Sequence, residues 1–364
     1  MKQFFKKYVP ISFAVVLVLF AFSCALLALS ADNPSLADGI SGGVGRALRE
    51  ALAYITNPIP ISVAELFVIA LILGAIALVL FSIFVIKGAR TRVRLLFHIL
   101  SFIFVMYSSY AIAFGASYHT TKIEEKMGFE AVEVTEEDLY ELAYYLVGEL
   151  NALAPEVSKP DGESEMDYDL RTLSERSVSA YDAFLADYPI FENFTSYVKP
   201  VMLSRLMAYG GILGMYTYFT GEANISVVYP DYCIPASVIH EFAHQRGVAR
   251  EDEANFISYA VCAYSDDAYI RYSGYLNLFE YTASALMQTD RERVSELYSM
   301  LDSGVISDMR AYNEFYRAHK VDFIRDISNF FNDTYLRLNG TEGVVSYSRV
   351  VRLSVSYYKS LGII

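Results

Sequence analysis

Three long apolar runs occupy the first third of the chain, and each is long enough to cross a membrane as a helix. They cover about residues 8–31, 62–86 and 95–117. A hydrocarbon core about 30 Å thick requires about 20 apolar residues in a helix, and backbone groups inside lipid must bond within their own segment. The pattern therefore predicts a membrane domain over residues 1–118 with three transmembrane helices in contact with the lipid bilayer.

The first apolar run has two interpretations. Basic residues precede it, and the small residues of Ala28-Leu29-Ser30-Ala31 end it, which is also typical of a signal peptide. Its apolar part is longer than the roughly 7–15 residues of a signal-peptide core. A retained membrane helix is therefore favoured over a cleaved one.

Basic residues predict the orientation of these helices. They cluster before the first run and between the second and third runs, at Lys2, Lys6, Lys7, Lys87, Arg90, Arg92 and Arg94. The positive-inside rule places both clusters in the cytoplasm. The loop over residues 32–61 and everything after Tyr118 then lie on the other side, whether or not the first helix is cleaved. We therefore expect a multi-pass protein of the cell membrane with an extracytoplasmic C-terminal domain.

Residues 119–364 have the pattern of one mainly helical domain. Thr135-Glu136-Glu137-Asp138 resembles a capping box, and leucines follow it at helical spacing. Further helices are expected over residues 169–186, 291–301, 307–338 and 346–360, a loop over 161–167, and a strand over 224–229. The predicted fold class is mainly α (α+β), with a small sheet in a largely helical domain that follows three transmembrane helices.

The net charge and the number of cysteines exclude some classes of function and of site. The net charge is -13, so a surface that binds nucleic acid is not expected. The three cysteines form no CxxC pair, which excludes a cysteine-rich zinc site or disulfide framework. Cys233 and Cys262 could form a disulfide in an oxidising compartment or remain as packed thiols.

One motif carries recognisable chemistry. His240-Glu241-Phe242-Ala243-His244 is a His-Glu-x-x-His sequence. Residues four apart on a helix are separated by about 40° around its axis, so His240 and His244 can direct two imidazoles at one metal ion. Glu241 lies on the adjacent side, where it can act as the general base on a metal-activated water.

The next segment offers a third ligand. Gly247 can end the motif helix in a left-handed cap, and a second helix is expected from Arg250. Glu251 and Asn255 share a face of that helix. Glu251 can therefore complete the ligand set, and Asn255 can support a ligand histidine through a hydrogen bond.

These residues resemble the gluzincin metallopeptidases, in which His-Glu-x-x-His precedes Glu-x-x-Ala-Asp or Glu-x-x-Ala-Asn on a following helix. The resemblance implies a zincin-like domain, a Zn2+ cofactor, Glu251 rather than Glu253 as the third ligand, and a peptide or protein substrate. The longer run from His240 to Phe256, with the upstream helices, is similar to a bacterial family of membrane-anchored proteins of unknown function. A non-catalytic zinc protein with a sensing or scaffolding role is the alternative function.

Two further expectations concern substrate handling. In zincins an edge strand before the motif helix aligns the substrate, and residues 224–229 are placed for that role or for an ordinary structural strand. A donor to the transition-state oxyanion is also expected. Its candidates are Tyr229, Tyr272, His319 and Tyr347.

Overall fold

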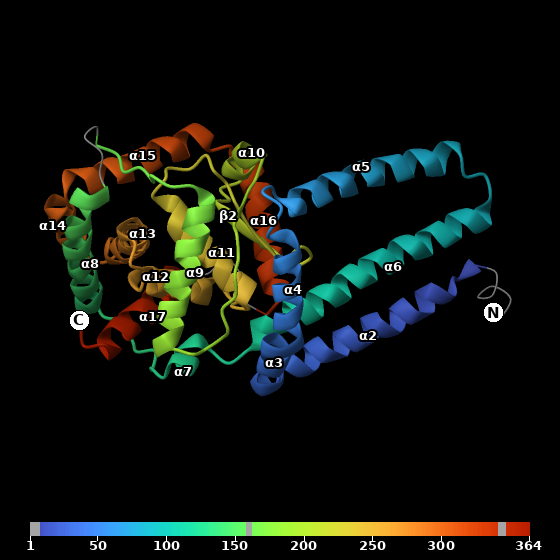
Figure 1. Ribbon diagram of the computed structural model, residues 1–364, viewed down its shortest axis with the longest axis horizontal. Coiled ribbons are helices and arrows are strands. Elements are labelled where there is room, and N and C mark those ends of the chain that lie inside the picture. Colours follow the sequence, from blue (N-terminus) through green and yellow to red (C-terminus); the bar gives the residue numbers. More distant parts are fainter. Residues whose placement is uncertain (1–7, 158–161, 341–346) are drawn as a thin grey trace.

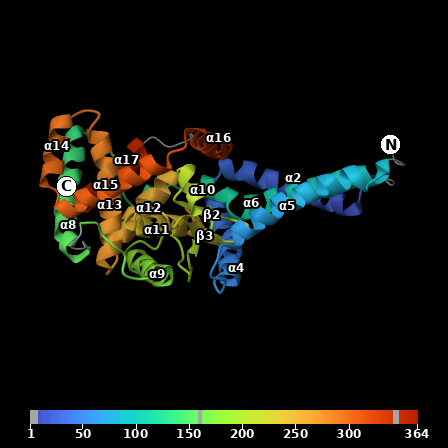
Figure 2. The ribbon, with the colours of Figure 1, turned by 90° about the horizontal axis from the view of Figure 1, so that it is seen from above.

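The computed structural model describes residues 8–157, 162–340 and 347–364. The molecule is elongated, with three long helices at one end and a helical domain at the other (Figure 1). A view from above shows the long helices running together away from the domain (Figure 2). The predicted fold class is confirmed: the chain is mainly helical and contains one small sheet.

The three long helices are α2 (Ile11–Ala31), α5 (Val63–Phe84) and α6 (Ala89–Ala113). All three have the length and composition to cross a membrane. They correspond to the three predicted apolar runs, although α6 begins earlier because its arginine-rich start is helical too. A 3-10 helix, η2 (Gly115–His119), continues α6 into the domain.

The segment between α2 and α5 is helical and packs against the domain, although the sequence predicted only a loop. It contains α3 (Pro34–Ile40), the π-helix η1 (Ser41–Gly45) and α4 (Arg46–Thr56). The Glu222 carboxylate accepts the first two backbone N–H groups of α5, and buried Lys199 donates to backbone carbonyls at and just beyond the end of α4. These bonds satisfy helix-end groups that have no partner inside the helix.

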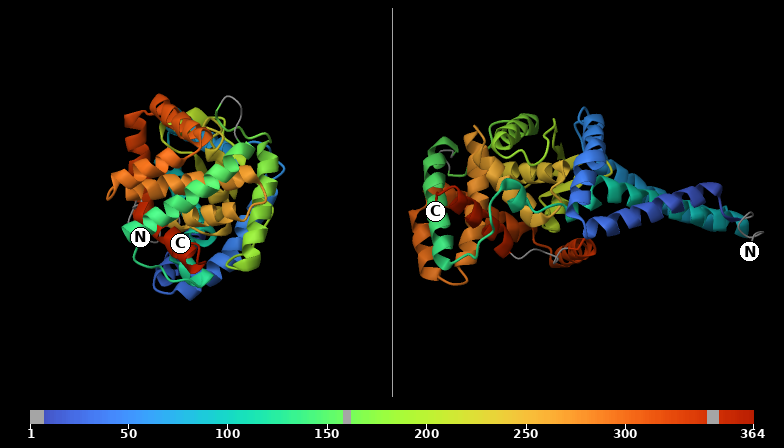
Figure 3. Two further views of the ribbon diagram at one scale, coloured as in Figure 1. Left: turned by 90° about the vertical axis from the view of Figure 1, so that its left-hand side faces the viewer. Right: turned by 90° about the horizontal axis from the view of Figure 1, so that it is seen from below.

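The domain is built mostly from helices around one core. α11, α12 and α13 pack against one another, and α8, α9 and α17 surround them (Figures 1 and 3). The helices of the domain are α7 (Ile123–Met127), α8 (Glu136–Val157), α9 (Leu170–Asp187), α10 (Ser204–Tyr209), α11 (Cys233–Arg246), α12 (Glu251–Ala263), α13 (Ala268–Leu286), α14 (Arg291–Met300), α15 (Ser303–His319), α16 (Asp322–Leu338) and α17 (Tyr347–Ser360).

The sheet lies against α11 and has the order β1-β3-β2. Its strands are β1 (Lys199–Pro200), β2 (Gly214–Thr217) and β3 (Glu222–Ile225). β3 pairs in parallel with β1 and antiparallel with β2, with Met215 opposite Asn224. The strand predicted over 224–229 is present as β3, which is shifted to residues 222–225. Of its two predicted roles, the structure supports the ordinary structural strand and not the edge strand, because β3 is paired on both sides and the edges belong to β1 and β2.

The other local predictions are confirmed in part. Thr135 and Asp138 cap each other reciprocally at the start of α8, since each accepts the backbone N–H of the other. The helix predicted over 307–338 is divided into two helices, α15 and α16, because Lys320 and Val321 between them are not helical. Cys233 and Cys262 are buried thiols with no disulfide between them.

Candidate metal centre

Two consecutive helices bring the motif residues together. α11 carries His240, Glu241 and His244, and it ends where Gly247 adopts the predicted left-handed conformation with φ 101°. A residue with a side chain would be strained there. The resulting turn lets α12 begin at Glu251 and pack back along α11.

The two histidines and Glu251 converge on one point. The Nε2 atom of His240 lies 3.3 Å from one Glu251 oxygen, and the Nε2 atom of His244 lies 3.5 Å from the other. Within the described residues these three side chains form the one group whose ligand atoms all lie within 4.8 Å of one another.

The distances fit a tetrahedral zinc site. Bond lengths of about 2.0–2.2 Å to nitrogen and oxygen give about 3.3–3.5 Å between ligand atoms at tetrahedral angles. Charge-assisted hydrogen bonds between imidazolium and carboxylate would be shorter, about 2.7–2.9 Å. The donor set of two imidazoles and one carboxylate therefore suits a shared ion better than a direct ion pair.

The candidate ligand His244 is oriented by the backbone. Its Nδ1 atom lies 2.7 Å from the carbonyl oxygen of Val248, in the turn between the two helices. A proton on Nδ1 leaves Nε2 free to bind a metal. The predicted support from Asn255 was wrong: Nδ1 of His240 has no hydrogen-bond partner among the described residues, and the Asn255 amide donates to the backbone carbonyl of Glu251 in its own helix.

Glu241 lies beside this group and against the edge strand. A Cβ atom on Gly214 would be 2.5 Å from the Glu241 carboxylate, so a glycine is required where β2 passes it. Glu241 is buried, and its Oε2 atom has no hydrogen-bond partner in the part of the chain that the structure describes. A buried carboxylate with an unpaired oxygen is the arrangement expected of a base whose proton donor is a bound water.

Charge interactions within the group are strong. Burial raises the pKa of Glu241, against the opposing effect of the two histidines. Burial lowers the pKa of His244, but the Glu251 carboxylate outweighs it and raises the value to about 9. For Glu251, burial opposes ionisation and the histidines more than compensate, so the pKa falls well below its usual range. Glu251 is therefore an anion at neutral pH.

Glu253, the alternative third ligand, lies elsewhere. Its carboxylate is 2.7 Å from the Arg250 guanidinium and accepts the backbone N–H of Ile123. This ion pair fixes the loop that enters α7 and directs the side chain away from the histidines. The structure thus brings Glu251, and not Glu253, to His240 and His244.

A cavity of about 920 Å³ contains the site. Its walls are β2 and its flanking loops, the end of α6 with η2, and residues of α10, α11, α12, α13, α16 and α17. Among the predicted oxyanion donors, Tyr229, Tyr272 and His319 do not line it; Tyr229 and His319 pack against Phe315, and Tyr272 bonds Asp308. The side chain of Tyr347 lies outside the described residues.

Other tyrosines, which sequence reasoning missed, line the cavity. They are Tyr118, Tyr216, Tyr218, Tyr259, Tyr281 and Tyr335. They come from six separate elements or loops, and with 30 tyrosines in the chain no sequence signal distinguishes them. Tyr118 and Tyr335 lie close enough to Glu251 for its charge to raise the pKa of each hydroxyl, beyond the larger effect of burial.

The chain matches one protein family over residues 41–355, a span that includes every residue of this site. That family is described as protein of unknown function (DUF3810). The chain belongs to the DUF3810 family. No curated protein and no solved structure matches the chain. The DUF3810 description names no activity, so the gluzincin resemblance stays a prediction from the residues.

In this DUF3810 protein a buried arginine joins the helical segment between α2 and α5 to the motif helix α11. Arg49 of α4 is almost completely buried, and within the described residues its donors bond to the backbone carbonyls of Ser41, Ala113, Gln245 and Arg246. Burial lowers its pKa to about 10, so it stays a cation at neutral pH. A Cβ atom on Gly247 would come within 2.5 Å of the guanidinium, so the glycine that ends α11 also makes room for Arg49.

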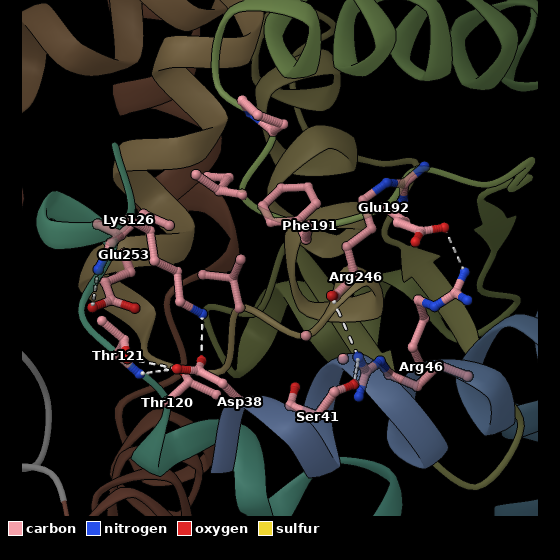
Figure 4. A pocket seen from close by; sticks show the side chains of 17 residues that line it. Asp38, Ser41, Arg46, Thr120, Thr121, Lys126, Phe191, Glu192, Arg246 and Glu253 are labelled. Atoms are coloured by element: carbon pink, nitrogen blue, oxygen red, sulfur yellow. Dashed lines mark hydrogen bonds and ion pairs between the residues drawn. The ribbon is translucent and has the colours of Figure 1, made fainter. Parts of the chain in front are cut away.

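A second cavity, of about 400 Å³, lies at the same junction. Figure 4 shows Lys126 directed at Asp38 and Arg46 directed at Glu192 across it, with N–O distances of 2.8 Å and 2.9 Å. These charged side chains neutralise one another. The cavity therefore lies where the segment between α2 and α5 meets the domain. Its described residues form no group of unpaired side chains that could bind a ligand.

Replacing Arg49 with methionine is expected to destabilise the protein by about 3 kcal/mol or more, because several buried carbonyls lose a charged donor. Arg46→Met on the same helix is the matched control. Arg46 forms partly exposed ion pairs with Glu50 and Glu192, which contribute about 1 kcal/mol or less. Denaturant unfolding of both purified variants measures the difference. Equal losses would contradict a specific role for Arg49.

Proposed function

We propose that this protein is a membrane-anchored zinc metallopeptidase that hydrolyses peptide bonds outside the cytoplasm. The observation that carries the proposal is the Glu251 carboxylate at 3.3 Å and 3.5 Å from the two motif histidines, with the unpaired oxygen of Glu241 beside them. His240, His244 and Glu251 would hold Zn2+. When bound, Zn2+ lowers the pKa of a coordinated water and polarises a carbonyl.

The chain's own residues supply the remaining chemistry. Glu241 takes the proton from the attacking water and can return it to the leaving amine. Burial, which raises the pKa of its carboxyl, makes it a stronger base than an exposed glutamate. The free edge of β2 borders the cavity and can pair with an extended peptide, as strands added to sheet edges do.

The alternative, a non-catalytic zinc protein, receives less support from the site. A structural zinc site normally closes its fourth position with a protein ligand. Here the three converging side chains border a cavity of about 920 Å³, large enough for a peptide segment. A buried base beside them has no role in a structural site.

The location outside the cytoplasm rests on the positive-inside rule. The basic link between α5 and α6 lies at the opposite end of the molecule from the domain (Figure 1). If that link is cytoplasmic, the domain and its site face outward. Protease accessibility in spheroplasts tests this placement, and protection of the domain until the membrane is permeabilised would contradict it.

Incubation of the purified full-length protein with a diverse peptide library tests the activity. We expect cleavage that stops with a zinc chelator and returns when zinc is added back. Cleavage that persists in chelator would assign hydrolysis to another site or to a contaminant. A His240→Ala, His244→Ala double variant, prepared in parallel, controls for contaminating peptidases.

A further inference from the structure

The outer ends of the membrane helices contact the same elements that enclose the site. The turn between β2 and β3 reaches both α5 and α6: Phe219 packs on Phe67, and Tyr218 donates to the backbone carbonyl of Met106. Glu65, in the first turn of α5, accepts the backbone N–H groups of Met202 and Leu203. The cavity wall is therefore continuous with the membrane-spanning part.

Helix α16 lies beside the end of α6 that contacts the domain. Its Tyr335 and the following Asn339 both bond the hydroxyl group of Tyr110, which lies less than one turn before the end of α6. The apolar part of α6 from Leu95 to Ala113 is about 28 Å long, close to the thickness of a hydrocarbon core. The C-terminal end of α16 is thus held at the edge of that core.

The direction of α16 suits a helix lying on a membrane. In Figure 1 it runs across the long axis of the molecule, and in Figure 2 and the right-hand view of Figure 3 it is seen nearly end-on. The three membrane helices follow the long axis. A bilayer around them therefore has its surface parallel to α16.

α16 leaves an apolar stripe uncovered. Phe323, Ile327, Phe330 and Leu338 recur at helical spacing, and Phe323, Phe330 and Leu338 are 74%, 67% and 82% exposed. Charged and amide side chains occupy another face, which makes the helix strongly amphipathic. Large apolar side chains with this exposure are unfavourable in water and favourable in the lipid interface.

We infer that the apolar stripe of α16 lies in the bilayer surface on the domain's side, and that the cavity thereby receives polypeptide segments held at that surface. The second half of this inference rests on the proposed function. Ile327 belongs to the stripe and also lines the cavity, together with Phe331 and Leu206 of α10. The apolar rim of the cavity thus continues into the membrane-facing stripe.

Tryptophan fluorescence tests the membrane contact without any requirement for zinc or activity. The chain contains no tryptophan, so Leu338→Trp and Phe323→Trp each introduce a single probe. Full-length variants are reconstituted in vesicles that contain brominated phospholipid. We expect both probes to be quenched strongly and to emit at shorter wavelength. Tyr144→Trp, an exposed position of α8 at the far end of the domain, is the control and should not be quenched.

If either α16 probe is no more quenched than the Tyr144→Trp control, the membrane contact is refuted, and a contact with a second protein would give that result. The substrate class needs a second measurement. A peptide that the enzyme cleaves in solution is given an acyl chain and bound to the same vesicles. Cleavage at least about tenfold more efficient than that of the free peptide is expected, and no preference would refute the substrate class. Absence of any cleavage would refute the proposed function and the substrate class with it, while the quenching result would stand.

Discussion

Replacing Glu241 with glutamine is expected to lower the rate of hydrolysis by about 100-fold or more while zinc stays bound. Glutamine has nearly the same size but cannot take a proton, and loss of a general base has this magnitude. The three proposed ligands are untouched. The fold should be no less stable, because the substitution removes a buried carboxylate with an unpaired oxygen.

Glu280→Gln provides the matched control. Glu280 lies on α13, does not line the cavity, and has a pKa raised to about 7 by burial alone. The same chemical change at this half-buried glutamate should leave hydrolysis intact. If Glu241→Gln retains full activity, or if both variants lose it equally, Glu241 is not the base.

Replacing Glu251 with glutamine is expected to weaken zinc binding by at least about 100-fold. The substitution removes the only anionic member of the proposed ligand set, and even residues that merely support ligands contribute about 10–100-fold. Hydrolysis should fall in proportion to bound zinc. Zinc titration of purified protein with a fluorescent competitor measures the affinity directly.

Glu253→Gln, two residues away, should lower the stability of the protein and leave its zinc affinity unchanged. It breaks the buried ion pair with Arg250, so the free energy of unfolding should fall by about 3–5 kcal/mol. The zinc affinity of the folded protein should not change. Loss of zinc in Glu253→Gln together with its retention in Glu251→Gln would contradict the ligand assignment.

The sequence predicted the elements whose signals are local and strong. Long apolar runs specified the three membrane helices, and Gly247 specified the end of α11 because only glycine adopts its conformation without strain. The spacing of His240 and His244 was enough to anticipate that they meet, and the family resemblance favoured Glu251 over Glu253 beside them. That convergence needs only helix geometry and one tight turn.

Other elements depend on contacts distant in sequence. α13 is buried along most of its faces, so it lacks the alternation of apolar and polar residues that indicates a surface helix. β2 has four residues and exists because it pairs with β3. The packing of α4 against the domain depends on Arg49. Its acceptors are backbone carbonyls, which every residue type has, so the sequence does not show where they are.

The direction of α16 relative to the three long helices also required the structure. The periodicity predicted a helix over the residues of α16, but not that it turns across the ends of the membrane helices. That direction follows from the break at Lys320 and from the contacts of Tyr335 and Asn339 with Tyr110.

The zinc content of the purified full-length protein is the most direct test of the proposed centre. Elemental analysis should find one zinc per chain in the wild-type protein, or one taken up after zinc is added near neutral pH. The His240→Ala, His244→Ala double variant should hold none above background. Wild-type protein that is free of zinc and fails to bind it, or a double variant that binds it equally well, would contradict the assignment of a zinc centre to these residues.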